Sequence, residues 1–578
     1  MQAPFGATVC PVRTEADAEA YTAWLASVGT VAVDTETTGL DVFSPGWSLR
    51  LVQIGDGDTA WVFEVGSEFD PLWKATLDSG RALIFHHATY DLLALRRLDL
   101  YPSTFDTKTL AHLVDPAGQH SLKKLCVELL GADASEGDEK LMAHFRSNGW
   151  KKGEGFAKVD LRHPDYVLYS GLDVVLTFRL FQKLRPLVVD SGQAHLVDFE
   201  RRVSHLMATL TERGMSVDKS YAYQLGCTYD ARREAAFDQC VIMGVDNPMS
   251  TKQVREALKA EGVTFTKKTA KGDYSVDEEA LSLIDHPLAA AVLGVRRAGK
   301  FRKSYVEGTL AVLGADGRSH PWINPLAART GRMAVSRPPL QQLPSSDADV
   351  RTMFVADPGH LIGASDYSNV ELRVLAALAD ERVMKQAFLD GSDLHQMTAD
   401  AAGVDRKLGK MANFLTVYGG GPQALAAQAK VDLRTADKVM SAFKRTYPGV
   451  DRWGKKLQMQ AQASRYQLRT ASGRRLPLDR DRIYAATNYV VQSTARDVLA
   501  QALLRLDEAG LFGHLLMVVH DECVWQAPAA DAEDVAQSFK EIMSFSDFHG
   551  LPLPVDSEVY GASWGAGYQQ STRPEEAA

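Results

Sequence analysis

Two apolar runs in this chain end in acidic corners: His360-Leu-Ile-Gly-Ala-Ser-Asp366-Tyr-Ser and Leu515-Leu-Met-Val-Val-His-Asp521-Glu522. Each run has the length and composition of a buried strand. A carboxylate at the tip of such a strand is costly unless a partner compensates its charge. Two tips brought together can hold divalent cations through oxygen ligands, as in-line phosphoryl transfer requires. We therefore expect Asp366 and Asp521 to share two metal ions, with Glu522 as an auxiliary carboxylate.

Between these runs, four side chains recur at every fourth position: Arg406, Lys410, Phe414 and Tyr418. This spacing predicts one helix face with cations for a triphosphate and aromatic rings for a base. Aromatic residues at helical spacing more often pack a core, and a helix lysine is more often solvated. The flanking cations and Gly419-Gly-Gly421 favour the nucleotide interpretation. With the acidic corners, this face indicates nucleotide polymerisation, and Lys410 is a candidate proton donor to pyrophosphate.

The composition is that of an ordinary soluble globular protein, with 578 residues, 45% hydrophobic and 24% charged. At ~150 residues per domain, the length predicts about four domains. The five cysteines are scattered without a CxxC pair, which argues against a zinc site or a disulfide framework and fits a reducing compartment. Because neither a signal peptide nor a membrane-spanning run is evident, we expect a cytoplasmic protein without a membrane partner.

Basic residues gather in two stretches although the formal net charge is −9. Residues 296–303 hold five of them without an acid, and residues 465–482 hold six, diluted by two aspartates. The distribution of charge matters more than its sum for a polyanionic partner. A charge run is usually only a solvated face, so neither stretch identifies a nucleic-acid partner by itself.

The chain pattern predicts an α/β unit first and a second strand-and-helix region later. Strands are expected to begin near residues 30, 49, 61 and 82, and helices to follow as far as residue 180. Residues 195–310 are expected to be mostly helical, and the proline-rich segment 320–345 to be irregular. After residue 360 the pattern returns to strand, long helices and strand, and the tail 571–578 is expected to fray.

Four N-terminal carboxylates and a tyrosine form a second candidate site. Asp34 and Glu36 share a strand face because side chains alternate with a period of two. Asp91 begins an apolar helix pattern, and Tyr169 and Asp173 are four apart on another helix. Taken singly, each acid is more readily explained as a cap or turn residue. As an ordered set they could bind two metal ions and orient a water molecule on a phosphodiester.

This N-terminal set resembles the three motifs of the DnaQ-like 3′–5′ exonucleases. The matching stretches are Asp34-Thr-Glu-Thr-Thr-Gly-Leu40, Tyr90-Asp91 and Tyr169-Ser-Gly-Leu-Asp173. The resemblance implies that Asp34, Glu36, Asp91, Tyr169 and Asp173 are catalytic and that the four acids are the metal ligands. One departure is His87, where the family usually has asparagine. A histidine can still donate a hydrogen bond, but its protonation becomes a variable.

The C-terminal part resembles family A DNA polymerases, the DNA polymerase I group. Asp366-Tyr-Ser-Asn-Val-Glu-Leu-Arg373 is similar to the first palm motif, and Val519-His-Asp-Glu522 to the second. The segment from Arg406 to Tyr418-Gly419 is similar to the fingers motif. Weaker matches keep the family's order, and the resemblance runs from about residue 28 to 565: Thr330-Gly-Arg332-Met, Leu340-Gln341-Gln-Leu-Pro, Asp393-Leu-His395, Tyr447-Pro-Gly-Val and Asn488-x-x-x-Gln492.

The resemblance implies roles for residues beyond the metal ligands. The incoming nucleotide would be bound by Tyr367, Glu371, His395, Arg406, Lys410, Phe414 and Tyr418. The template-primer would be contacted by Arg332, Gln341, Asn488, Gln492, His520 and, in the thumb, Arg296, Lys300 and Arg302. Phenylalanine at position 414 implies discrimination against dideoxynucleotides. Glu371 would be a steric gate against a ribose 2′-hydroxyl, but Ser368-x-x-Glu371 also has the spacing of a capping box at the start of the helix 370–379.

Three features depart from the usual family pattern. Leu415 stands where glycine is common, and the stretch between Thr398 and Arg406 is short, which predicts trimmed fingers. The segment 200–320 has no long insertion that would suggest a processivity-factor site. We expect no 5′-nuclease domain, because nothing precedes the exonuclease domain. Such compact polymerases resemble phage-encoded members.

We therefore expect a multidomain protein of α/β and α+β class. An RNase H-like 3′–5′ exonuclease domain would span residues 1–190, and a right-hand polymerase domain residues 191–578. Within the latter, we expect the thumb at about 195–320, the palm at about 320–380 and 480–578, and the fingers at about 381–480.

The expected activity is template-directed extension of a primer with deoxynucleotides, with excision of 3′ mismatches. Each active site would use two Mg²⁺ ions, with Mn²⁺ as a substitute. The partners would be primer-template DNA and dNTPs, the chain would act as a monomer, and a phage-encoded enzyme would work in the host cytoplasm. The alternatives are an exonuclease with a catalytically silent DNA clamp and a non-enzymatic nucleic-acid scaffold.

Overall fold

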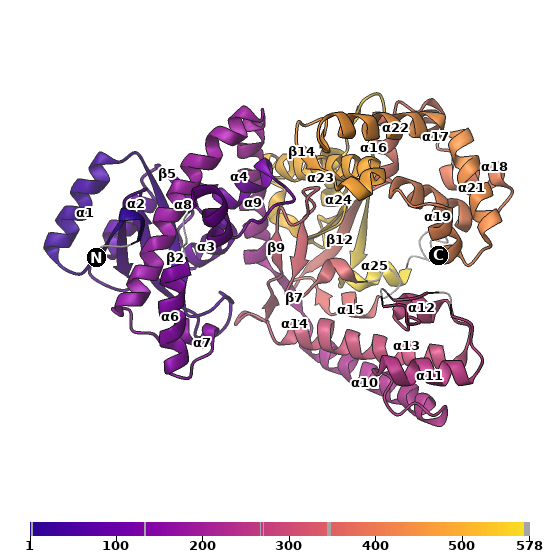
Figure 1. Cartoon of the computed structure of the whole chain (residues 1–578), viewed down its shortest axis with the longest axis horizontal. Coiled ribbons are helices and arrows are strands. Elements are labelled where there is room, and N and C mark those ends of the chain that lie inside the picture. The colour runs from indigo at the N-terminus through magenta and orange to yellow at the C-terminus, as the bar shows by residue number, and fades with distance from the viewer. Residues whose placement is uncertain (2–3, 132–134, 266, 270, 344–347, 571–578) are drawn as a thin grey trace.

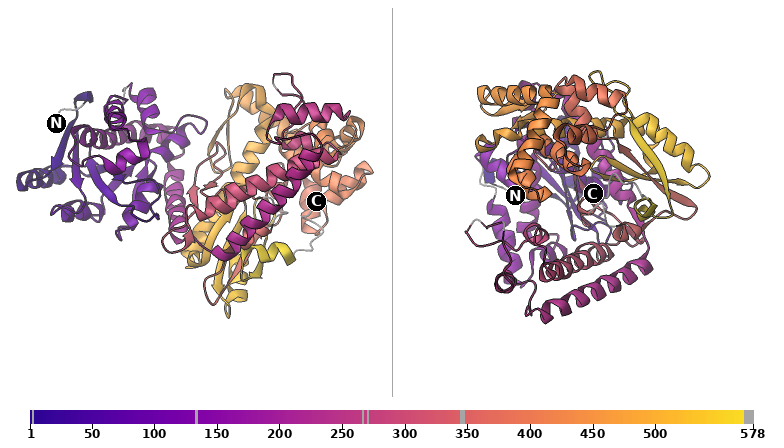
Figure 2. Two further views of the ribbon diagram at one scale, coloured as in Figure 1. Left: turned by 90° about the horizontal axis from the view of Figure 1, so that it is seen from below. Right: turned by 90° about the vertical axis from the view of Figure 1, so that its right-hand side faces the viewer.

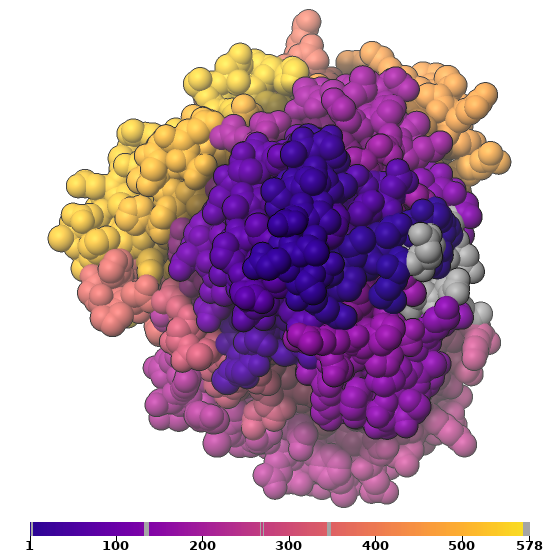
Figure 3. Space-filling model, turned by 90° about the vertical axis from the view of Figure 1, so that its left-hand side faces the viewer, coloured from indigo at the N-terminus to yellow at the C-terminus, as the bar shows by residue number. Residues whose placement is uncertain are grey.

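The computed structural model describes residues 1, 4–131, 135–265, 267–269, 271–343 and 348–570. An N-terminal part, which ends in the long helix α8 (Pro164–Asp190), lies beside a larger C-terminal part (Figure 1). Viewed from the N-terminal side, the first part stands in front of the second (Figure 3). The tail expected to fray and Pro344 lie outside the described residues. Within these residues, no helix combines the length and apolar composition needed to cross a bilayer.

The N-terminal part is built on a six-stranded sheet with the strand order β1-β4-β3-β2-β5-β6. Strands β2, β3 and β4 are antiparallel neighbours, and the outer pairs are parallel. Four strands lie where the sequence predicts them: β2 (Thr30–Thr37), β3 (Leu49–Gly55), β4 (Thr59–Glu64) and β5 (Ala82–Phe85). The sequence pattern does not predict the two edge strands, β1 (Thr8–Val12) and β6 (Thr104–Asp106).

Helices cover both faces of this sheet because alternate residues of β2 point to opposite sides. Val31 and Val33 pack into one core, which α1 (Glu15–Ser27) and α2 (Asp70–Leu77) complete. Ala32 packs into the other core, with buried residues of α8. Asp34 and Glu36 have the parity of Ala32, so they lie on the α8 side. The remaining helices of this part are α3 (Ala88–Arg96), α4 (Thr107–Val114), α5 (Leu122–Leu125), α6 (Ser135–Ser147) and α7 (Lys152–Lys158).

The C-terminal part is built on an antiparallel sheet with the order β15-β16-β12-β17. Its strands are β12 (His360–Tyr367), β15 (Leu515–Val519), β16 (Glu522–Pro528) and β17 (Val555–Gly561). The two acidic corners therefore come from one sheet, as the sequence predicts. The core of this sheet is shared with α16 (Val370–Leu378), α23 (Ala486–Glu508) and α24 (Ala532–Met543).

Two helical groups lie on different sides of this sheet (Figure 1 and Figure 2). The expected fingers are α17 (Arg382–Leu389), α18 (Leu394–Ala402), α19 (Arg406–Val417), α20 (Pro422–Ala429), α21 (Leu433–Thr446) and α22 (Pro448–Ala463). The expected thumb has α10 (Lys219–Ile242) and α13 (Pro287–Lys300) packed together, with α11 (Thr251–Ala260) and α12 (Glu278–Ser282). The segment expected to be irregular contains two short paired strands, β9 (Trp322–Asn324) and β10 (Ala334–Ser336).

Helix α9 (Ala194–Arg213) joins the two parts, because it packs against α3 and α4 on one side and α23 and β9 on the other. Its Glu200 is fully buried and accepts two hydrogen bonds from Arg496 at 2.6 and 2.7 Å. Arg474 also pairs with Glu200, and it bonds Asp497 at 2.8 Å. One member of the basic stretch 465–482 is therefore a buried structural arginine, not part of a solvated face.

Candidate active sites

One cavity of about 550 Å³ lies between the tips of the C-terminal sheet and helix α19. It brings together residues that the sequence assigns separately to catalysis, nucleotide binding and DNA binding. The assigned residues that line it are Arg332, Gln341, Asp366, Tyr367, Glu371, His395, Arg406, Lys410, Phe414, Tyr418, Gln492, His520 and Asp521. The residues assigned to the polymerase reaction or its DNA that do not line this cavity are Glu522, Asn488, Arg296, Lys300 and Arg302.

Asp366 and Asp521 meet because the strands that carry them are neighbours. Strands β12 and β16 pair antiparallel with Asp366 opposite Glu522, and Asp521 stands in the turn just before Glu522. His520 has a φ of 58° in this turn, a left-handed conformation that lets the chain reverse. Burial raises the pKa of Asp521, and the negative charge of Glu371 adds to the effect. A cation between the two aspartates would relieve both costs.

Glu522 faces away from the cavity although it is adjacent to Asp521. Its carboxylate accepts hydrogen bonds from Tyr568 at 2.9 Å and from Trp564 at 3.4 Å, both on α25 (Trp564–Gln570). Burial raises the pKa of Glu522. The structure thus holds this carboxylate against α25, because successive residues entering a strand point to opposite faces.

Helix α19 presents Arg406, Lys410 and Phe414 to the cavity, and Tyr418 follows its last turn. The helix begins after Asp405, which accepts a capping hydrogen bond from the Leu408 amide at 2.8 Å. The guanidinium of Arg406 pairs with Asp393 at 2.5 Å. The spacing-based prediction of one functional face therefore agrees with the arrangement of the helix.

Leu415, which departs from the family pattern, is buried on the other side of α19. Its side chain fills the space where a side chain at Gly420 would have to lie, since an added Cβ would come within 2.3 Å of it. Leu415 therefore requires a glycine at position 420.

Glu371 does not form the capping box that its spacing suggests. Helix α16 begins after Asn369 without a side-chain cap, and the Ser368 hydroxyl donates to Asp556 at 2.6 Å. The carboxylate of Glu371 pairs with Arg332 and accepts a hydrogen bond from the Tyr418 hydroxyl at 2.9 Å. The capping interpretation is therefore wrong, because tertiary partners from two other segments attract this carboxylate more strongly.

The imidazole of His395 is held by Asn413, a residue that the sequence analysis did not single out. Asn413 lies one turn past Lys410 on the buried side of α19, and its amide nitrogen is 3.0 Å from His395 Nδ1. Burial lowers the pKa of His395 to about 4, so the ring is neutral at neutral pH. With Nδ1 accepting from the amide, the proton is on Nε2. The hydroxyl of Tyr367, in contrast, donates to the Met543 carbonyl at 2.7 Å and does not serve the cavity.

The residues expected to contact DNA differ in their exposure and in whether protein groups already bind their side chains. His520 Nε2 is 3.0 Å from the Gln341 carbonyl, which joins two of them at the cavity rim. The side chain of Asn488 is buried outside the cavity. Arg296 donates to the carbonyls of Pro248 and Val276, at 3.0 and 2.5 Å.

In the rest of the thumb cluster, Arg302 pairs with Asp230 at 3.1 Å and with Glu307 at 2.9 Å. Lys300 is exposed. Since protein groups already hold the two arginines, Lys300 is the best placed of these three residues for a phosphate contact.

The N-terminal carboxylates lie close enough to affect one another's ionisation. Burial raises the pKa of Asp34 well above its ordinary range, and repulsion from Asp91 raises it further. Burial likewise raises the pKa of Glu36 and of Asp173, and raises that of Asp91 to about 7. The Thr35 hydroxyl donates to Asp91 at 2.6 Å and fixes it beside β2. The structure therefore gathers the four acids that the sequence orders along the chain.

A cation that the sequence analysis missed lies among these acids. The ammonium of Lys123, on α5, pairs with Asp173 and lies 5.1 Å from the centre of the Tyr169 ring. Its Nζ is also 3.5 Å from Asp138 on α6. No spacing signal identifies Lys123, because α5 and α8 meet only in the folded chain.

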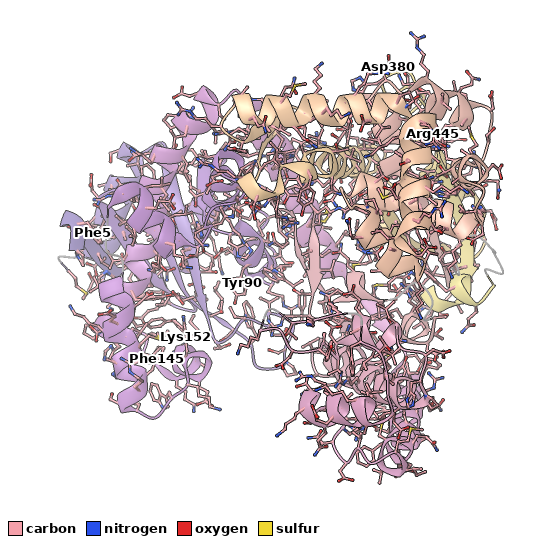
Figure 4. All side chains as sticks on the ribbon, turned by 45° about the vertical axis from the view of Figure 1, so that its right-hand side comes forward. Phe5, Tyr90, Phe145, Lys152, Asp380 and Arg445 are labelled. Atoms are coloured by element: carbon pink, nitrogen blue, oxygen red, sulfur yellow. The ribbon has the colours of Figure 1, made fainter. Side chains whose placement is uncertain are left out.

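Two aromatic rings that neighbour Asp91 in sequence lie against Trp322 of the C-terminal part. Tyr90, which Figure 4 labels, donates to the Gly39 carbonyl at 2.8 Å, and its ring is 6.1 Å from that of Trp322. His87 is left-handed, with a φ of 68°, and its ring is 5.8 Å from the same tryptophan. Burial lowers the pKa of His87 to about 3, so its charge is not a variable at neutral pH, contrary to the sequence-based expectation.

Both carboxylate sets have the chemistry that Mg²⁺ requires, namely hard oxygen donors in a buried setting. Among the described residues, no three His, Cys, Asp or Glu side chains are already close enough together to hold an ion. Burial and neighbouring carboxylates raise the pKa of Asp34 and Asp521, so the nearby cations Lys123 and Arg332 compensate these acids only in part. A divalent cation would supply the remaining positive charge and draw the donors together.

Comparisons with known proteins find relatives for both parts of the chain. The family "DNA polymerase family A" matches residues 222–566, and the family "3′-5′ exonuclease" matches residues 9–189. The DNA polymerase of Mycobacterium phage L5 is 39% identical, over 97% of each chain. The DNA polymerase of Mycobacterium phage D29 is 38% identical, over 93% of each.

A solved structure shows the same fold at lower identity. The polymerase domain of Pol1 from M. smegmatis, in complex with DNA primer-template and dNTP, matches with a TM-score of 0.79 and 23% identity. The match covers 94% of this chain and 98% of that one.

The chain belongs to the family A DNA polymerases. It is a DNA polymerase with an N-terminal 3′–5′ exonuclease domain, as the sequence motifs predict. Polymerases and exonucleases of these families use divalent metal ions.

Proposed function

We propose that the 550 Å³ cavity is the polymerase active site and that Asp366 and Asp521 are its metal ligands. Two bound Mg²⁺ ions, or Mn²⁺ in their place, would activate the primer 3′-hydroxyl and neutralise charge on the triphosphate. The proposal is supported by one observation above all: both aspartates share a single cavity with Arg406 and Lys410. Glu522 has a supporting role from behind the strand, since α25 holds its carboxylate.

The face of α19 would bind the incoming deoxynucleotide. Arg406 and Lys410 would contact phosphate oxygens, and Lys410 would protonate the leaving pyrophosphate. The neutral His395 would donate from Nε2 to the triphosphate. Phe414 and Tyr418 would pack against the sugar and base, while Glu371, fixed by its two partners, would exclude a ribose 2′-hydroxyl.

Primer-template DNA would lie along the cavity and the thumb. Arg332, Gln341, Gln492 and His520 line the cavity where the duplex end would reach the metal ligands. Lys300 would add a phosphate contact from the thumb. The Pol1 neighbour was solved with primer-template DNA and dNTP, which supports the same two ligands for this chain. We propose a monomer that acts in the host cytoplasm if the chain is phage-encoded.

The N-terminal carboxylates would form the exonuclease site. Asp34, Glu36, Asp91 and Asp173 would hold two metal ions, and the Tyr169 hydroxyl would orient the attacking water. This assignment is supported by the mutual repulsion of the buried acids, which a pair of divalent cations would relieve.

Two sets of variants test this division of labour. Asp34→Ala with Glu36→Ala should abolish 3′ excision and retain primer extension, whereas Asp366→Asn or Asp521→Asn should do the reverse. Since loss of an outer-shell partner of a metal already costs 10- to 100-fold, we expect losses above about 100-fold. Primer extension and excision would be followed on one labelled primer-template, with and without dNTPs. Extension near the parent rate by either palm variant would refute the metal assignment, and excision alone by the parent would favour a silent clamp.

A further inference from the structure

Lys123 is a half-buried cation that the proposed exonuclease chemistry does not use. Its ammonium pairs with Asp173, which is a proposed metal ligand, and lies beside the Tyr169 ring. Its positive charge lowers the pKa of Asp34, Glu36 and Asp173, against the larger effect of burial. Lys123 therefore compensates part of the negative charge of the site when no metal is bound.

The position of this ammonium is incompatible with a metal ion on Asp173. A metal ion on Asp173 would compete with the ammonium for Oδ1, and like charges repel strongly at such short separation. The lysine side chain is flexible, with four methylene groups, so the ammonium can move while its backbone stays in place.

Asp138 offers the ammonium a second position. Its Oδ1 is 3.5 Å from Lys123 Nζ, is buried, and accepts no hydrogen bond from the described residues. Buried carboxylate oxygens are rarely left without a donor. The Asp138 side chain is also more exposed than that of Asp173, at 33% against 11%, so it lies on the solvent side of the cluster.

We propose that Lys123 is an internal counter-cation of the exonuclease site, which holds Asp173 in the metal-free enzyme and moves to Asp138 when divalent ions bind. This proposal rests on the metal-ligand role proposed above for Asp173. It implies that the lysine competes with the metal, so the pair Lys123 and Asp138 sets the apparent metal affinity of this site. Neither Lys123 nor Asp138 lines the palm cavity, so the metal affinity of that site should be unaffected by changes to this pair.

Manganese binding provides a direct test. Free Mn²⁺ would be titrated by electron paramagnetic resonance in an Asp366→Asn, Asp521→Asn background, so that the remaining tight binding reports the exonuclease site. Lys123→Met removes the charge and keeps the length of the side chain. If the lysine occupies Asp173 about nine-tenths of the time, its removal should tighten Mn²⁺ binding roughly tenfold.

Asp138→Asn should act in the opposite direction. It removes the alternative position of the ammonium and should weaken Mn²⁺ binding several-fold. The double variant should match Lys123→Met alone, because Asp138 matters only when a lysine is present. Lys123→Arg keeps the charge and should stay near the parent affinity.

Thermal unfolding separates this role from a purely structural ion pair. Lys123→Met should lower the melting temperature in EDTA, and saturating Mn²⁺ should abolish the difference from the parent. Equal destabilisation with and without Mn²⁺, together with unchanged Mn²⁺ affinity, would overturn the proposal. Asp173→Asn is the control for its premise: if this variant binds Mn²⁺ like the parent, the ligand assignment itself is wrong. If Asp173→Asn weakens binding but Lys123→Met does not tighten it, only the counter-cation role fails.

Discussion

The two carboxylate sites of this polymerase compensate their charge in opposite ways. In the exonuclease domain, Asp34 is repelled by Asp91, Asp173 and Glu36, and Lys123 pairs with one of these acids. In the polymerase cavity, Asp366 and Asp521 share the lining with four basic side chains, of which Arg496 already pairs with Glu200: Arg332, Arg406, Lys410 and Arg496. The first site would therefore depend more on cations from solution than the second.

This difference in surrounding protein charge matches the charge of the substrate that each site would bind. A phosphodiester carries one negative charge, which two metal ions and a lysine can balance. A triphosphate carries several, and it leaves as pyrophosphate, so fixed basic groups are needed beside the metals. The comparison teaches that similar metal ligands can serve different reactions when the surrounding protein charge changes.

Glu200 extends the comparison to a carboxylate that arginines neutralise without any metal. Glu200→Gln would leave the buried Arg474 and Arg496 with Asp497 as their remaining charged partner, and should cost about 3–5 kcal/mol of unfolding free energy. Asp34→Asn should instead raise the unfolding free energy in EDTA, because it removes a charge that neighbouring carboxylates repel. Calorimetry of both variants in EDTA is the measurement. Stabilisation by Glu200→Gln would show that the arginines do not depend on this carboxylate.

The pH dependence of the two carboxylates should also be opposite. Burial disfavours the charge of Glu200, but Arg496 and Arg474 lower its pKa to about 2, from an ordinary 4.5. Its contribution to stability is therefore complete above about pH 4.5 and is lost as the pH falls through about 2. Asp91, with its pKa raised to about 7, instead destabilises the metal-free fold increasingly as the pH rises from about 4 to about 7.

Phe414→Tyr tests whether the face of α19 lies at the sugar of the nucleotide. Phenylalanine cannot replace the hydrogen bond that a dideoxynucleotide lacks at its 3′ position, and tyrosine can. A hydrogen bond to a charged group contributes about 1.5–3 kcal/mol, so dideoxynucleotide incorporation should rise roughly tenfold to a hundredfold. Chain termination at a fixed ddNTP to dNTP ratio, in an Asp34→Ala background, measures it. Equal termination by parent and variant would remove Phe414 from the nucleotide site.

Glu371→Ala tests the steric gate in the same cavity. The variant removes a side chain held by Arg332 and Tyr418, so we expect ribonucleotide incorporation to rise about tenfold or more relative to dNTPs. Single-nucleotide insertion of rNTP and dNTP by parent and variant is the measurement. Unchanged sugar selection would mean that this carboxylate only organises its two partners.

The smallest expected effect is in the thumb. Lys300→Ala should weaken binding of every primer-template sequence and reduce the slope of log affinity against log salt by roughly 0.9. Arg296→Ala is the matched control, because its guanidinium is engaged by two carbonyl groups and should leave the salt slope unchanged. A reduced slope for Arg296→Ala but not for Lys300→Ala would reverse the assignment.

Structural features that depend on neighbouring residues along the chain could be predicted from local sequence patterns. The alternation of β2, the fourfold spacing on α19 and the two acidic corners identified the sheets and the cavity, because each is a short-range periodicity. Partners from distant segments were not predictable in this way. The sequence placed Arg474 in a basic stretch and Arg296 at the template-primer, and it left a helix cap open as a role for Glu371. Nothing local reveals their actual partners Glu200, Pro248 and Arg332.

Helix α9 bears on how a mispaired primer would travel between the two sites. The helix is fixed to α23 through Glu200 and to the exonuclease domain through Glu212, which pairs with Arg96 at 3.0 Å. One continuous helix therefore ties the N-terminal part to the C-terminal part. If this helix keeps the two proposed sites at a fixed separation, the primer end has to cover that separation by melting from the template. The number of base pairs that melt before excision would then be a property of enzyme geometry, the same for every mismatch and every sequence.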